Sequence, residues 1–518
     1  AIFMDCDMLV LDDIANLWDF KNDKFDVMCV KHNHTPKETK KFLNQPQTQY
    51  EKKNWSSVML FNSQKCKVLT PKYVNEETGL NLHRFNWVGD DTLIGDLPPR
   101  WNHLVDYDPK VPEEQLSNLH FTTGGPYFEK FKKCGYSDLW FKEKFIIARS
   151  RINKKRFEEA YGLLINHGVL DSGNLAKAEW HAGWLALRFL NKPDAAVQHF
   201  KTMYDGVNYP ISKSRAAYWV GKAYEQLGKD QNAKDWYKKS SVFNTTFYGQ
   251  LASAKINKKD FKVKNNYTFS QEDYKKLLKT DLARAVILLD ELDMSLKSKD
   301  ILRHLGSEER SIKEQVLAGK LSQQVGRLDF AIQIAKQISY QNKNLLELNY
   351  PIIETPKVVS KRTILPQEVI LSLIRQESEF DRDANSWVGA KGLMQIMPAT
   401  GRLVSKQAGL RYSRSRLIED EFFNLQLGSY YISGLNDEFN GAIYMAFAGY
   451  NAGPHRVRRW VKRFGDPRKG EIDPIDWIEL IPFTETRNYV QRVIENIQVY
   501  KYVINKKTVT NNIEKMLF

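Results

Sequence analysis

Three patterns of hydrophobic and polar residues follow one another along the chain. Over residues 1–135, short apolar runs at 1–4 and 57–62 are separated by turn-forming glycines and prolines, which is typical of strands joined by loops. From about 140 to 350, Ala, Leu, Trp and Tyr recur at steps of three and four residues, which indicates a helical array. Helical periodicity returns over 367–380. We therefore expect a mainly α chain with a small α/β segment at its start.

The helical array contains a sequence repeat. A shift of 37 residues pairs small residues with small ones and aromatic residues with aromatic ones: Ala186 with Ala223, Leu190 with Leu227, Lys192 with Lys229, Ala196 with Ala233, and Phe200 with Tyr237. Helix-turn-helix repeats use such pairs, because a small residue lets the next helix approach while the aromatic ring fills the gap. The repeat predicts a helical solenoid, and the alternative is an unrelated helical bundle.

A proline-rich stretch interrupts the helical pattern at Pro351, Pro356 and Pro366. Proline lacks a backbone donor and disfavours helix in the residue before it, so we place a domain boundary near residue 360. The resulting division is 1–138 for the α/β segment, 139–258 for the superhelical repeats, 259–358 for a helical linker domain, and 359–518 for a compact C-terminal domain.

Composition narrows the class of protein. The 518 residues are 42% hydrophobic and 27% charged, which excludes a disordered or fibrous chain. No apolar run approaches the roughly 18 residues that a transmembrane helix needs. The net charge of +15 is concentrated between residues 141 and 360, without a nucleic-acid-binding signature. We expect no nucleic-acid partner, and the basic excess fits an anionic polymer such as the cell wall, or solubility alone.

The distribution of the cysteines and the first residues of the sequence indicate that the chain joins two segments of different origin. All four cysteines, Cys6, Cys29, Cys66 and Cys134, lie in the first segment, as expected for a reducing cytosol, whereas the rest of the chain suits an oxidising periplasm. Residue 1 is Ala, and no signal peptide is visible. We expect that a leader is missing or that the sequence begins within a longer gene, and that the join near residue 140 is a fusion or assembly artefact.

Glu377 is the candidate for acid/base chemistry. It follows Ile370, Leu373 and Ile374 by seven, four and three residues, so all four share one helical face. A carboxyl group on a buried face has a raised pKa and can keep its proton near neutral pH as a general acid. The alternative is a structural Glu, paired with Arg or bonded to a backbone amide.

Further motifs separate these readings. The segment 386–401 places glycines before an apolar stretch that contains a side-chain amide. The segment 446–454 reads Ala-Phe-Ala-Gly-Tyr-Asn-Ala-Gly-Pro, and the segment 481–490 is the last of these motifs. Together with Glu377-Ser378, these motifs resemble the soluble lytic transglycosylases, which cleave peptidoglycan. The resemblance implies a mainly α fold, with a helical superhelix followed by a lysozyme-like catalytic domain. Residues 247–252 resemble the motif that ends the family's superhelix, although only about 120 superhelical residues precede Tyr248, so the ring looks incomplete.

Roles carry over by position in these motifs. The resemblance implies that Glu377 is the single catalytic acid/base and that Tyr450 hydrogen-bonds its carboxyl group. Glu485 would face the peptide stem. The full set of implied substrate-binding residues is Ser386, Met394, Gln395, Tyr450, Asn451 and Glu485. Gly449 departs from the family, which usually has Ala there.

The implied chemistry needs one carboxylate rather than the usual pair. Nearby Glu379, Asp381 and Asp383 are expected on the exposed edge of the helix end. In the family, the substrate's N-acetyl group assists cleavage of the MurNAc-GlcNAc β-1,4 bond, and the muramyl 6-hydroxyl attacks to give a 1,6-anhydro product without a cofactor. The implied partners are glycan strands and peptide stems, the protein would be a periplasmic monomer, and the alternative within the fold is a goose-type lysozyme that uses water.

The first segment carries a separate candidate site. Asp5-Cys6-Asp7 follows an apolar strand, and carboxylates at this spacing can bind a divalent cation. With His120-Phe121-Thr122-Thr123-Gly124-Gly125, the motif resembles the glycogenin-like retaining glycosyltransferases, which implies Mn²⁺ bound by Asp5, Asp7 and His120. Only four residues precede Asp5, so we expect a truncated remnant that binds sugar nucleotide poorly. A metal-dependent glycosyltransferase and a non-catalytic helical scaffold are the alternatives from other classes.

Overall fold

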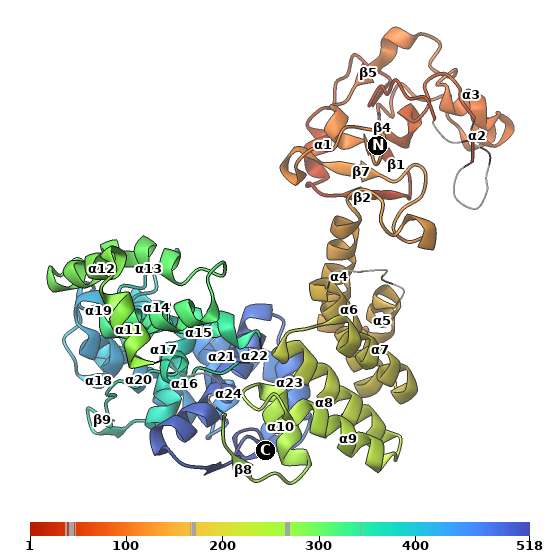
Figure 1. Cartoon of the computed structure of the whole chain (residues 1–518). Coiled ribbons are helices and arrows are strands. Elements are labelled where there is room, and N and C mark those ends of the chain that lie inside the picture. The colour runs from red at the N-terminus through yellow and green to blue at the C-terminus, as the bar shows by residue number, and fades with distance from the viewer. Residues whose placement is uncertain are drawn as a thin grey trace. The chain divides into compact units, whose positions relative to one another are not determined.

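The computed structural model describes residues 1–36, 39–40, 46, 48–165, 167, 172–264, 270–341 and 343–518. The chain forms two compact units (Figure 1). The first unit contains Ala1–Arg151 and Glu159–Asn174, and the second contains Ile152–Glu158 and Leu175–Phe518. Within the described ranges, none of the helices combines the length and the apolar character required to span a bilayer.

The first unit contains two small sheets and short helices. One sheet has the strand order β1-β4-β3-β5 and the other β2-β7-β6. Its strands are β1 (Ile2–Met4), β2 (Met8–Val10), β3 (Val27–Cys29), β4 (Val58–Phe61), β5 (Ile94–Asp96), β6 (His103–Leu104) and β7 (Asn118–His120). Its helices include α1 (Ala15–Trp18), α2 (Pro71–Glu76) and α3 (Gly79–His83), and α4 (Ser137–Asn153) and α5 (Phe157–Leu164) follow. The apolar runs expected near residues 1–4 and 57–62 are indeed paired strands.

The helical array begins the second unit. Its helices are α6 (Ser172–Arg188), α7 (Pro193–Gly206), α8 (Pro210–Gln226), α9 (Asp230–Ser241) and α10 (Phe247–Lys255). A Cβ atom on Gly183 would lie 2.6 Å from the Phe200 ring, and one on Gly221 would lie 2.6 Å from the Tyr237 ring. The aromatic partners expected from the repeat therefore pack on glycines of the preceding helix, which lets the helices of each pair approach closely.

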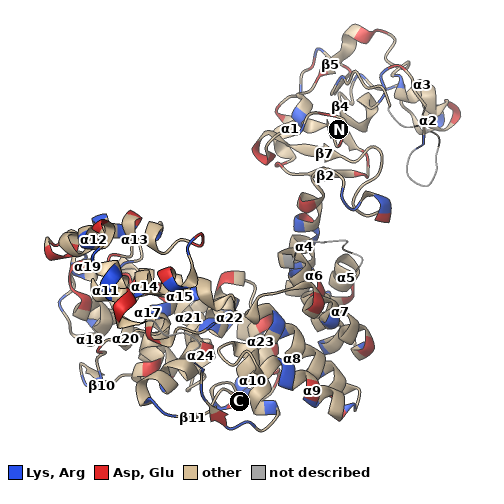
Figure 2. Cartoon of the chain, in the orientation of Figure 1, with Lys and Arg blue, Asp and Glu red and all other residues tan. Residues whose placement is uncertain are grey.

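Six helices follow the superhelical repeats and surround a separate apolar core that includes Val286, Leu302, Leu321 and Phe330. They are α11 (Gln271–Leu278), α12 (Asp281–Glu291), α13 (Lys299–Leu305), α14 (Ile312–Gln324), α15 (Leu328–Ser339) and α16 (Leu346–Asn349). Along this unit, Lys and Arg are interspersed with Asp and Glu, as expected of a solvated surface (Figure 2).

The C-terminal helices pack around α17 (Gln367–Glu377) and the long α24 (Thr484–Asn505). The others are α18 (Pro398–Ala408), α19 (Arg416–Glu419), α20 (Glu421–Glu438), α21 (Ile443–Ala452), α22 (Pro454–Phe464) and α23 (Pro474–Leu480). Two short antiparallel pairings join β8 (Asp260–Phe261) to β11 (Val509–Thr510), which are distant in the sequence, and β9 (Val358–Val359) to β10 (Arg362–Thr363). The mainly α fold class expected from the sequence is confirmed.

A buried carboxylate fastens the superhelix to the C-terminal helices. Glu479 on α23 has no exposed surface, and its oxygens lie 2.6 Å from an Arg215 nitrogen and 3.6 Å from Arg487 Nε. The Tyr248 hydroxyl donates a further hydrogen bond to Glu479. Tyr248 belongs to the 247–252 motif, so this motif provides a polar contact between α10 and α23. A carboxylate enclosed this way depends on its cationic and hydroxyl partners.

Candidate active site

Glu377 is the last residue of α17 and lies at the end of the buried face of this helix. Ile370, Leu373 and Ile374 on this face are fully buried, as the periodicity predicted, while the Glu377 residue itself is half-buried. Glu379 and Phe380 then adopt left-handed backbone conformations, with φ of 53° and 65°, which turn the chain away from the helix axis. The carboxyl group is therefore held at a helix end rather than within the helix surface.

Tyr489 on α24 is the hydrogen-bond partner of Glu377. Its hydroxyl donates to Glu377 Oε1 at 2.6 Å, and the Tyr489 side chain is only 4% exposed. Burial raises the pKa of Glu377 to about 8, the hydrogen bond from Tyr489 opposes this rise, and the nearby Glu485 charge adds to it. Burial and the Glu377 charge in turn raise the pKa of Tyr489, so its hydroxyl remains a donor. The carboxyl group can thus carry a proton at neutral pH.

Tyr489 was missed in the sequence, although a signal for it exists. It lies four residues after Glu485 on α24, and residues at this spacing lie on one face of a helix. Since Glu485 was expected at the site, this spacing identifies Tyr489 as a second residue on the same face. Glu485 is exposed, and its charge acts on Glu377 without a direct hydrogen bond between them among the described contacts.

The expectation that Tyr450 hydrogen-bonds the Glu377 carboxyl group is wrong. The Tyr450 hydroxyl donates to the backbone carbonyl oxygen of Met394 at 2.8 Å. Tyr450 is still close enough to Glu377 for the carboxylate charge, after burial, to raise the pKa of its hydroxyl. The difference arises because Tyr489, from the long helix α24, takes the hydroxyl position beside the carboxylate. Tyr450 instead fixes the segment that contains Met394 and Gln395.

The segment from Ser386 to Gln395 folds into a tightly bonded loop. Ser386 Oγ accepts from the Ala390 amide at 2.9 Å, and the Gln395 side-chain amide donates to the carbonyl oxygens of Ala384 and Gly392 at 3.1 and 2.9 Å. Gln395 itself has a φ of 45°, and Met394 is fully buried. These polar groups therefore shape the loop, and their predicted role as cleft-lining residues stays a prediction.

Two further predicted residues lie at α21 and α24. Asn451, near the end of α21, accepts a 2.6 Å hydrogen bond from Thr486 Oγ1 on α24. Thr486 directly follows Glu485, so Asn451 ties the end of α21 to the turn of α24 that carries Glu485. The structure thus brings Tyr450, Asn451 and Glu485 together with Glu377 around three helix ends, those of α17 and α21 and the start of α24.

The expectation that Glu379 and Asp381 lie on an exposed edge is wrong. Both are half-buried: Glu379 forms an ion pair with Lys336 of α15, and burial together with the Asp329 charge raises the pKa of Asp381. The left-handed turn at Glu379 and Phe380 directs this segment back toward the neighbouring helices. Asp383 is exposed, as expected.

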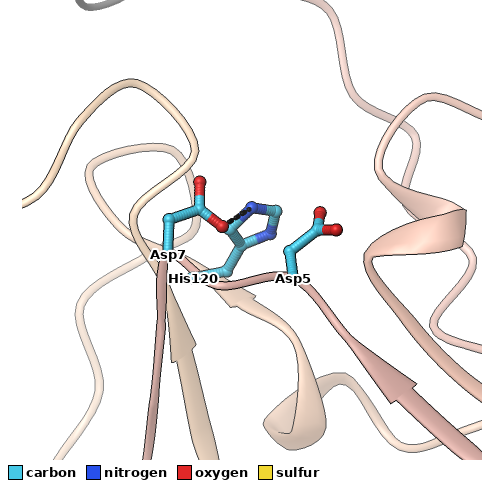
Figure 3. A group of neighbouring side chains, drawn as sticks. All are labelled: Asp5, Asp7 and His120. Carbon is cyan, nitrogen blue, oxygen red and sulfur yellow. Dashed lines mark ion pairs between the residues drawn. The ribbon is translucent and has the colours of Figure 1, made fainter.

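The first unit brings Asp5, Asp7 and His120 together (Figure 3). Asp5 and Asp7 lie between β1 and β2, and His120, at the end of β7, pairs with Met8 next to Asp7. One possible ligand atom from each residue lies within 4.8 Å of the others, and His120 Nε2 is 3.5 Å from Asp7 Oδ1. His120 is 2% exposed, so it is a buried residue rather than a surface loop histidine. Burial raises the pKa of Asp5, with an opposing contribution from His120.

The donor set of this cluster fits a divalent cation. Two carboxylates and an imidazole are ligands that Mn²⁺ accepts. The Nδ1 atom of His120 lies 3.0 Å from Asn102 Oδ1, a contact that fixes the ring and turns Nε2 toward Asp7. The three residues expected to share a metal are therefore adjacent.

Comparisons with known proteins give one family-model match and several similar proteins. Residues 355–472 match the family model of the transglycosylase SLT domain. The chain is 36% identical over 144 residues to the soluble lytic murein transglycosylase of Escherichia coli K12, an alignment that covers 28% of this chain and 22% of that protein. It is also 44% identical over 165 residues to Protein CDI of Arabidopsis thaliana, covering 31% of this chain and 62% of that one. The chain thus spans less than two thirds of either relative.

A solved structure supports the same assignment. The X-ray structure of an inactive variant of lytic transglycosylase Slt from Pseudomonas aeruginosa aligns with a TM-score of 0.57 at 26% identity, covering 70% of this chain and 58% of that one. The resemblance of the first segment to glycogenin-like glycosyltransferases has no support among these matches and stays a prediction. By sequence and by fold, the chain resembles soluble lytic transglycosylases, and its residues 355–472 match the transglycosylase SLT domain model.

Proposed function

We propose that this chain is a peptidoglycan lytic transglycosylase in which Glu377 is the single acid/base. The observation that carries the proposal is the Glu377 carboxyl group, with a pKa raised to about 8 by burial and a hydroxyl donor from Tyr489 at 2.6 Å. The SLT domain match and the names of the relatives support it. The solved Pseudomonas aeruginosa structure is of a variant made inactive by replacing one Glu with Gln.

In the proposed reaction, Glu377 first donates a proton to the substrate and later accepts one from it. Protonated Glu377 donates to the oxygen of the MurNAc-GlcNAc bond as the bond from this oxygen to the muramyl anomeric carbon breaks. The substrate's N-acetyl group assists at that carbon. The resulting Glu377 carboxylate accepts the proton of the muramyl 6-hydroxyl, whose oxygen then bonds to the anomeric carbon. The product is a 1,6-anhydro ring, and the carboxyl group is protonated again without consuming water.

Neighbouring residues would assist this cycle by position and charge. Tyr489 donates to the carboxylate form of Glu377, which stabilises the intermediate stage of the cycle. Tyr450 holds the Met394 carbonyl oxygen and so orders the loop that ends at Gln395. We propose that Ser386, Met394, Gln395, Tyr450 and Asn451 bind the glycan strand and that Glu485 meets the peptide stem.

Digestion of purified peptidoglycan sacculi tests the proposal. The full chain is expected to release 1,6-anhydromuropeptides, detected by mass spectrometry, and Glu377→Gln is expected to abolish the release while leaving the fold intact by circular dichroism. Glu419→Gln, on an exposed helix end of the same domain, is the matched control and should retain activity. Equal activity in wild type and Glu377→Gln would contradict the proposal.

The product also separates the alternative chemistries. A goose-type lysozyme would incorporate oxygen from ¹⁸O-labelled water into the new reducing end, whereas the internal attack incorporates none. A non-catalytic scaffold would bind sacculi without releasing any product. The proposal therefore requires soluble product that is anhydro-terminated and free of ¹⁸O.

We further propose that the wall-degrading part acts in the periplasm as a monomer. Peptidoglycan is the substrate named for the relatives' class, and no cysteine follows Cys134, which suits an oxidising compartment. Fractionation of cells that express the chain, followed by light scattering of the purified protein, tests both points.

For the first unit, we propose a divalent-cation site formed by Asp5, Asp7 and His120. A bound cation would offset the repulsion between the two carboxylates and could bind the diphosphate of a sugar nucleotide. Titration of the full chain with Mn²⁺, followed by electron paramagnetic resonance, should show binding that Asp7→Asn weakens at least tenfold and that Asp19→Asn, an exposed control, leaves unchanged. Mn²⁺-dependent turnover of a UDP-sugar would favour the glycosyltransferase alternative.

A further inference from the structure

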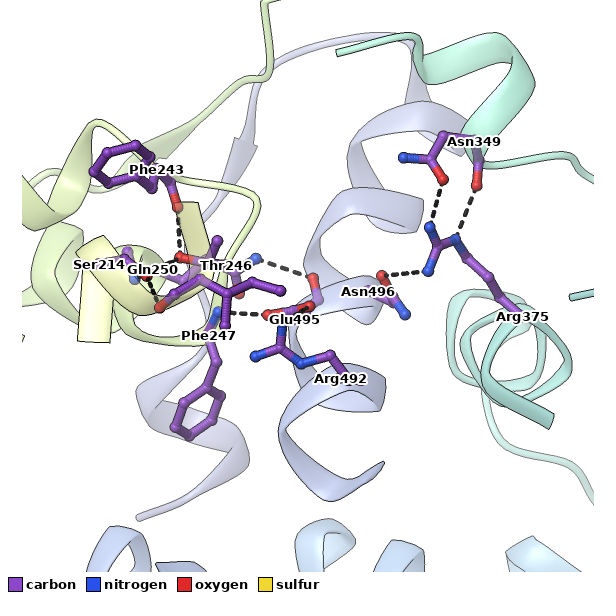
Figure 4. Close-up of polar contacts among 12 residues, drawn as sticks. Ser214, Phe243, Thr246, Phe247, Gln250, Asn349, Arg375, Arg492, Glu495 and Asn496 are labelled. Carbon is purple, nitrogen blue, oxygen red and sulfur yellow. Dashed lines mark hydrogen bonds and ion pairs between the residues drawn. The ribbon is translucent and has the colours of Figure 1, made fainter. Parts of the chain in front are cut away.

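A small cavity lies beside α17, and Glu377 is not among the residues that line it. It has a volume of about 230 Å³ and lies among α8, α10, α15, α16, α17 and α24. Its polar lining includes Lys336, Asn349, Arg375, Arg492, Glu495 and Asn496. We call this cavity the Arg375 pocket, and several of its residues are drawn in Figure 4.

Two of the three cations in the Arg375 pocket have carboxylate partners. Arg492 Nη1 lies 2.9 Å from Glu495 Oε1, and Lys336 pairs with Glu379. Glu495 is occupied further, since its Oε2 accepts the backbone amide of Phe247 at 2.6 Å (Figure 4). Burial raises the pKa of Glu495 to about 7, and the charge of Arg492, the Phe247 amide and the charges of Arg375 and Lys336 oppose this rise, so its negative charge is incomplete at neutral pH.

Arg375 is the cation without a carboxylate in contact. It is 9% exposed, and its hydrogen bonds within the described chain go to the Asn349 carbonyl oxygen at 2.8 Å, to Asn349 Oδ1, and to Asn496 Oδ1 at 3.4 Å (Figure 4). All three acceptors are neutral amide oxygens. A guanidinium carries about five N–H donors, so part of its donor capacity is left over. A buried charge is ordinarily paired, because leaving it among neutral groups costs solvation free energy.

A second group in the pocket also lacks a partner. Asn496 is 1% exposed, and its Nδ2 has no hydrogen-bond acceptor among the described residues, although Nδ2 is a strong donor. Asn496 lies on α24 beside Arg375, to which it offers only its oxygen. The Arg375 guanidinium also lies over the Tyr350 ring, 4.7 Å from its centroid. An Asn496 amide donor without an acceptor and a guanidinium whose hydrogen-bond acceptors are all neutral therefore line one cavity, and both would bind oxygens that carry negative charge.

The backbone around the pocket favours the same charge. Pro210 and Ile211 at the start of α8, and Thr245 and Thr246 before α10, line the cavity. Helix N-termini carry partial positive charge. The α10 end already holds one carboxylate, that of Glu495, through the Phe247 amide. Side chains and helix ends thus combine into a site built for an anion.

We propose that the Arg375 pocket binds a small oxyanion, a carboxylate or a phosphate group, paired with Arg375 and hydrogen-bonded by the Asn496 amide. The cavity volume admits such a group or the acidic end of a small molecule. The inference does not depend on the proposed activity, because Glu377 does not line the Arg375 pocket and anion binding is measured without substrate.

Isothermal titration calorimetry and thermal unfolding of the full chain test the proposal. Titrations with inorganic phosphate and with acetate, against sodium chloride at matched ionic strength, are expected to show saturable binding of at least one anion. At about ten times the measured Kd, that anion should raise Tm by roughly 2–4 °C above the chloride control. Phosphate alone would assign a phosphate site, and acetate alone a carboxylate site. Binding of neither anion would overturn the proposal.

A variant that supplies its own carboxylate locates the site. Asn496→Asp keeps the shape of the side chain and places an anion beside Arg375, so it should lose the anion-induced Tm shift while its resting Tm equals or exceeds that of wild type. Asn505→Asp, the same change at an exposed position of α24, should keep the shift. Should Asn496→Asp fold poorly, Arg375→Gln serves instead, with loss of calorimetric binding as the readout. An anion response that survives in the folded variant would overturn the assignment to this pocket.

Discussion

The Tyr489 hydroxyl lies 2.6 Å from Oε1 of Glu377, and it is the one side-chain hydrogen-bond donor to this carboxyl group within the described structure. Two residues act on the carboxyl group in opposite directions, since Tyr489 favours its ionised form and Glu485 its neutral form. The pKa of Glu377 therefore depends on a balance that substitutions can shift either way. Each of the first three predictions tests one part of that balance.

Tyr489→Phe removes the donor to Glu377. Loss of a hydrogen bond to a charged group costs about 1.5–3 kcal/mol, so kcat/KM should fall by roughly ten- to a hundredfold. Because this bond lowers the pKa of Glu377, the alkaline limb of the pH profile should move above its wild-type position near pH 8. Tyr412→Phe is the control, because the Tyr412 hydroxyl has no partner within the described chain, and it should leave the profile in place. A profile that does not move in Tyr489→Phe would show that the bond plays no part in tuning Glu377.

Glu485→Gln removes a negative charge near Glu377. This charge raises the pKa of Glu377, so the alkaline limb should move to lower pH, opposite to the change in Tyr489→Phe. Glu485 is exposed, and salt screens such interactions, so the shift should shrink in about 1 M NaCl. The pH dependence of kcat/KM at two salt concentrations checks both points, with Glu419→Gln as the control. A shift to higher pH would contradict the assigned sign.

Glu377→Gln should change the pH dependence of stability. The pKa of Glu377 rises from 4.5 to about 8 on folding, so at low pH the carboxyl group is protonated in both states. As the pH rises from 4.5 to 8, the unfolded chain ionises first, and wild-type stability falls. The Gln variant has no such loss and should be more stable than wild type at pH 8.5 by about 2–4 kcal/mol, and nearly equal at pH 4.

Denaturant unfolding at the two pH values measures this difference. The comparison uses the second unit's transition, since the chain has more than one unit and a single transition is not assumed. An equal effect of the substitution at both pH values would mean that Glu377 is not shifted.

Gly249→Ala tests the close packing at the start of α10. A Cβ atom at this position would lie 2.0 Å from the Phe243 carbonyl oxygen, so backbone must move, and we expect a loss of at least about 2 kcal/mol. Gly162→Ala is the matched control, because no atom lies within 4 Å of its added Cβ and alanine favours helix. Thermal unfolding of both variants should show a fall in Tm only for Gly249→Ala.

Periodicity predicted the elements of this chain well, because each element depends mainly on local spacing. The buried face of α17 was predicted from Ile370, Leu373 and Ile374, and the strands of the first unit from their apolar runs. The aromatic partners of the repeat, Phe200 and Tyr237, were found in the same way. Local patterns carry this information because the helical and strand repeats fix which side chains share a face.

Contacts between distant elements could not be predicted in the same way. The choice of Tyr489 over Tyr450 as the partner of Glu377 depends on how α24 crosses α17, which no local pattern contains. The burial of Glu379 depends on two consecutive left-handed residues that are not glycine, an uncommon backbone state. The Arg375 pocket likewise arises only where six helices meet. Residue spacing supplies the candidates, and tertiary packing selects among them.

The enclosure of Glu479 by Arg215 and Arg487 has a consequence for how this protein can be divided. Separating the C-terminal helices from the superhelix would expose to solvent a carboxylate that now has no exposed surface. It would leave Arg215 without its carboxylate partner and Arg487 as the remaining arginine beside Glu479. We therefore expect that the C-terminal helices that carry Glu377 do not fold independently, and that their stability and solubility depend on the superhelix that precedes them.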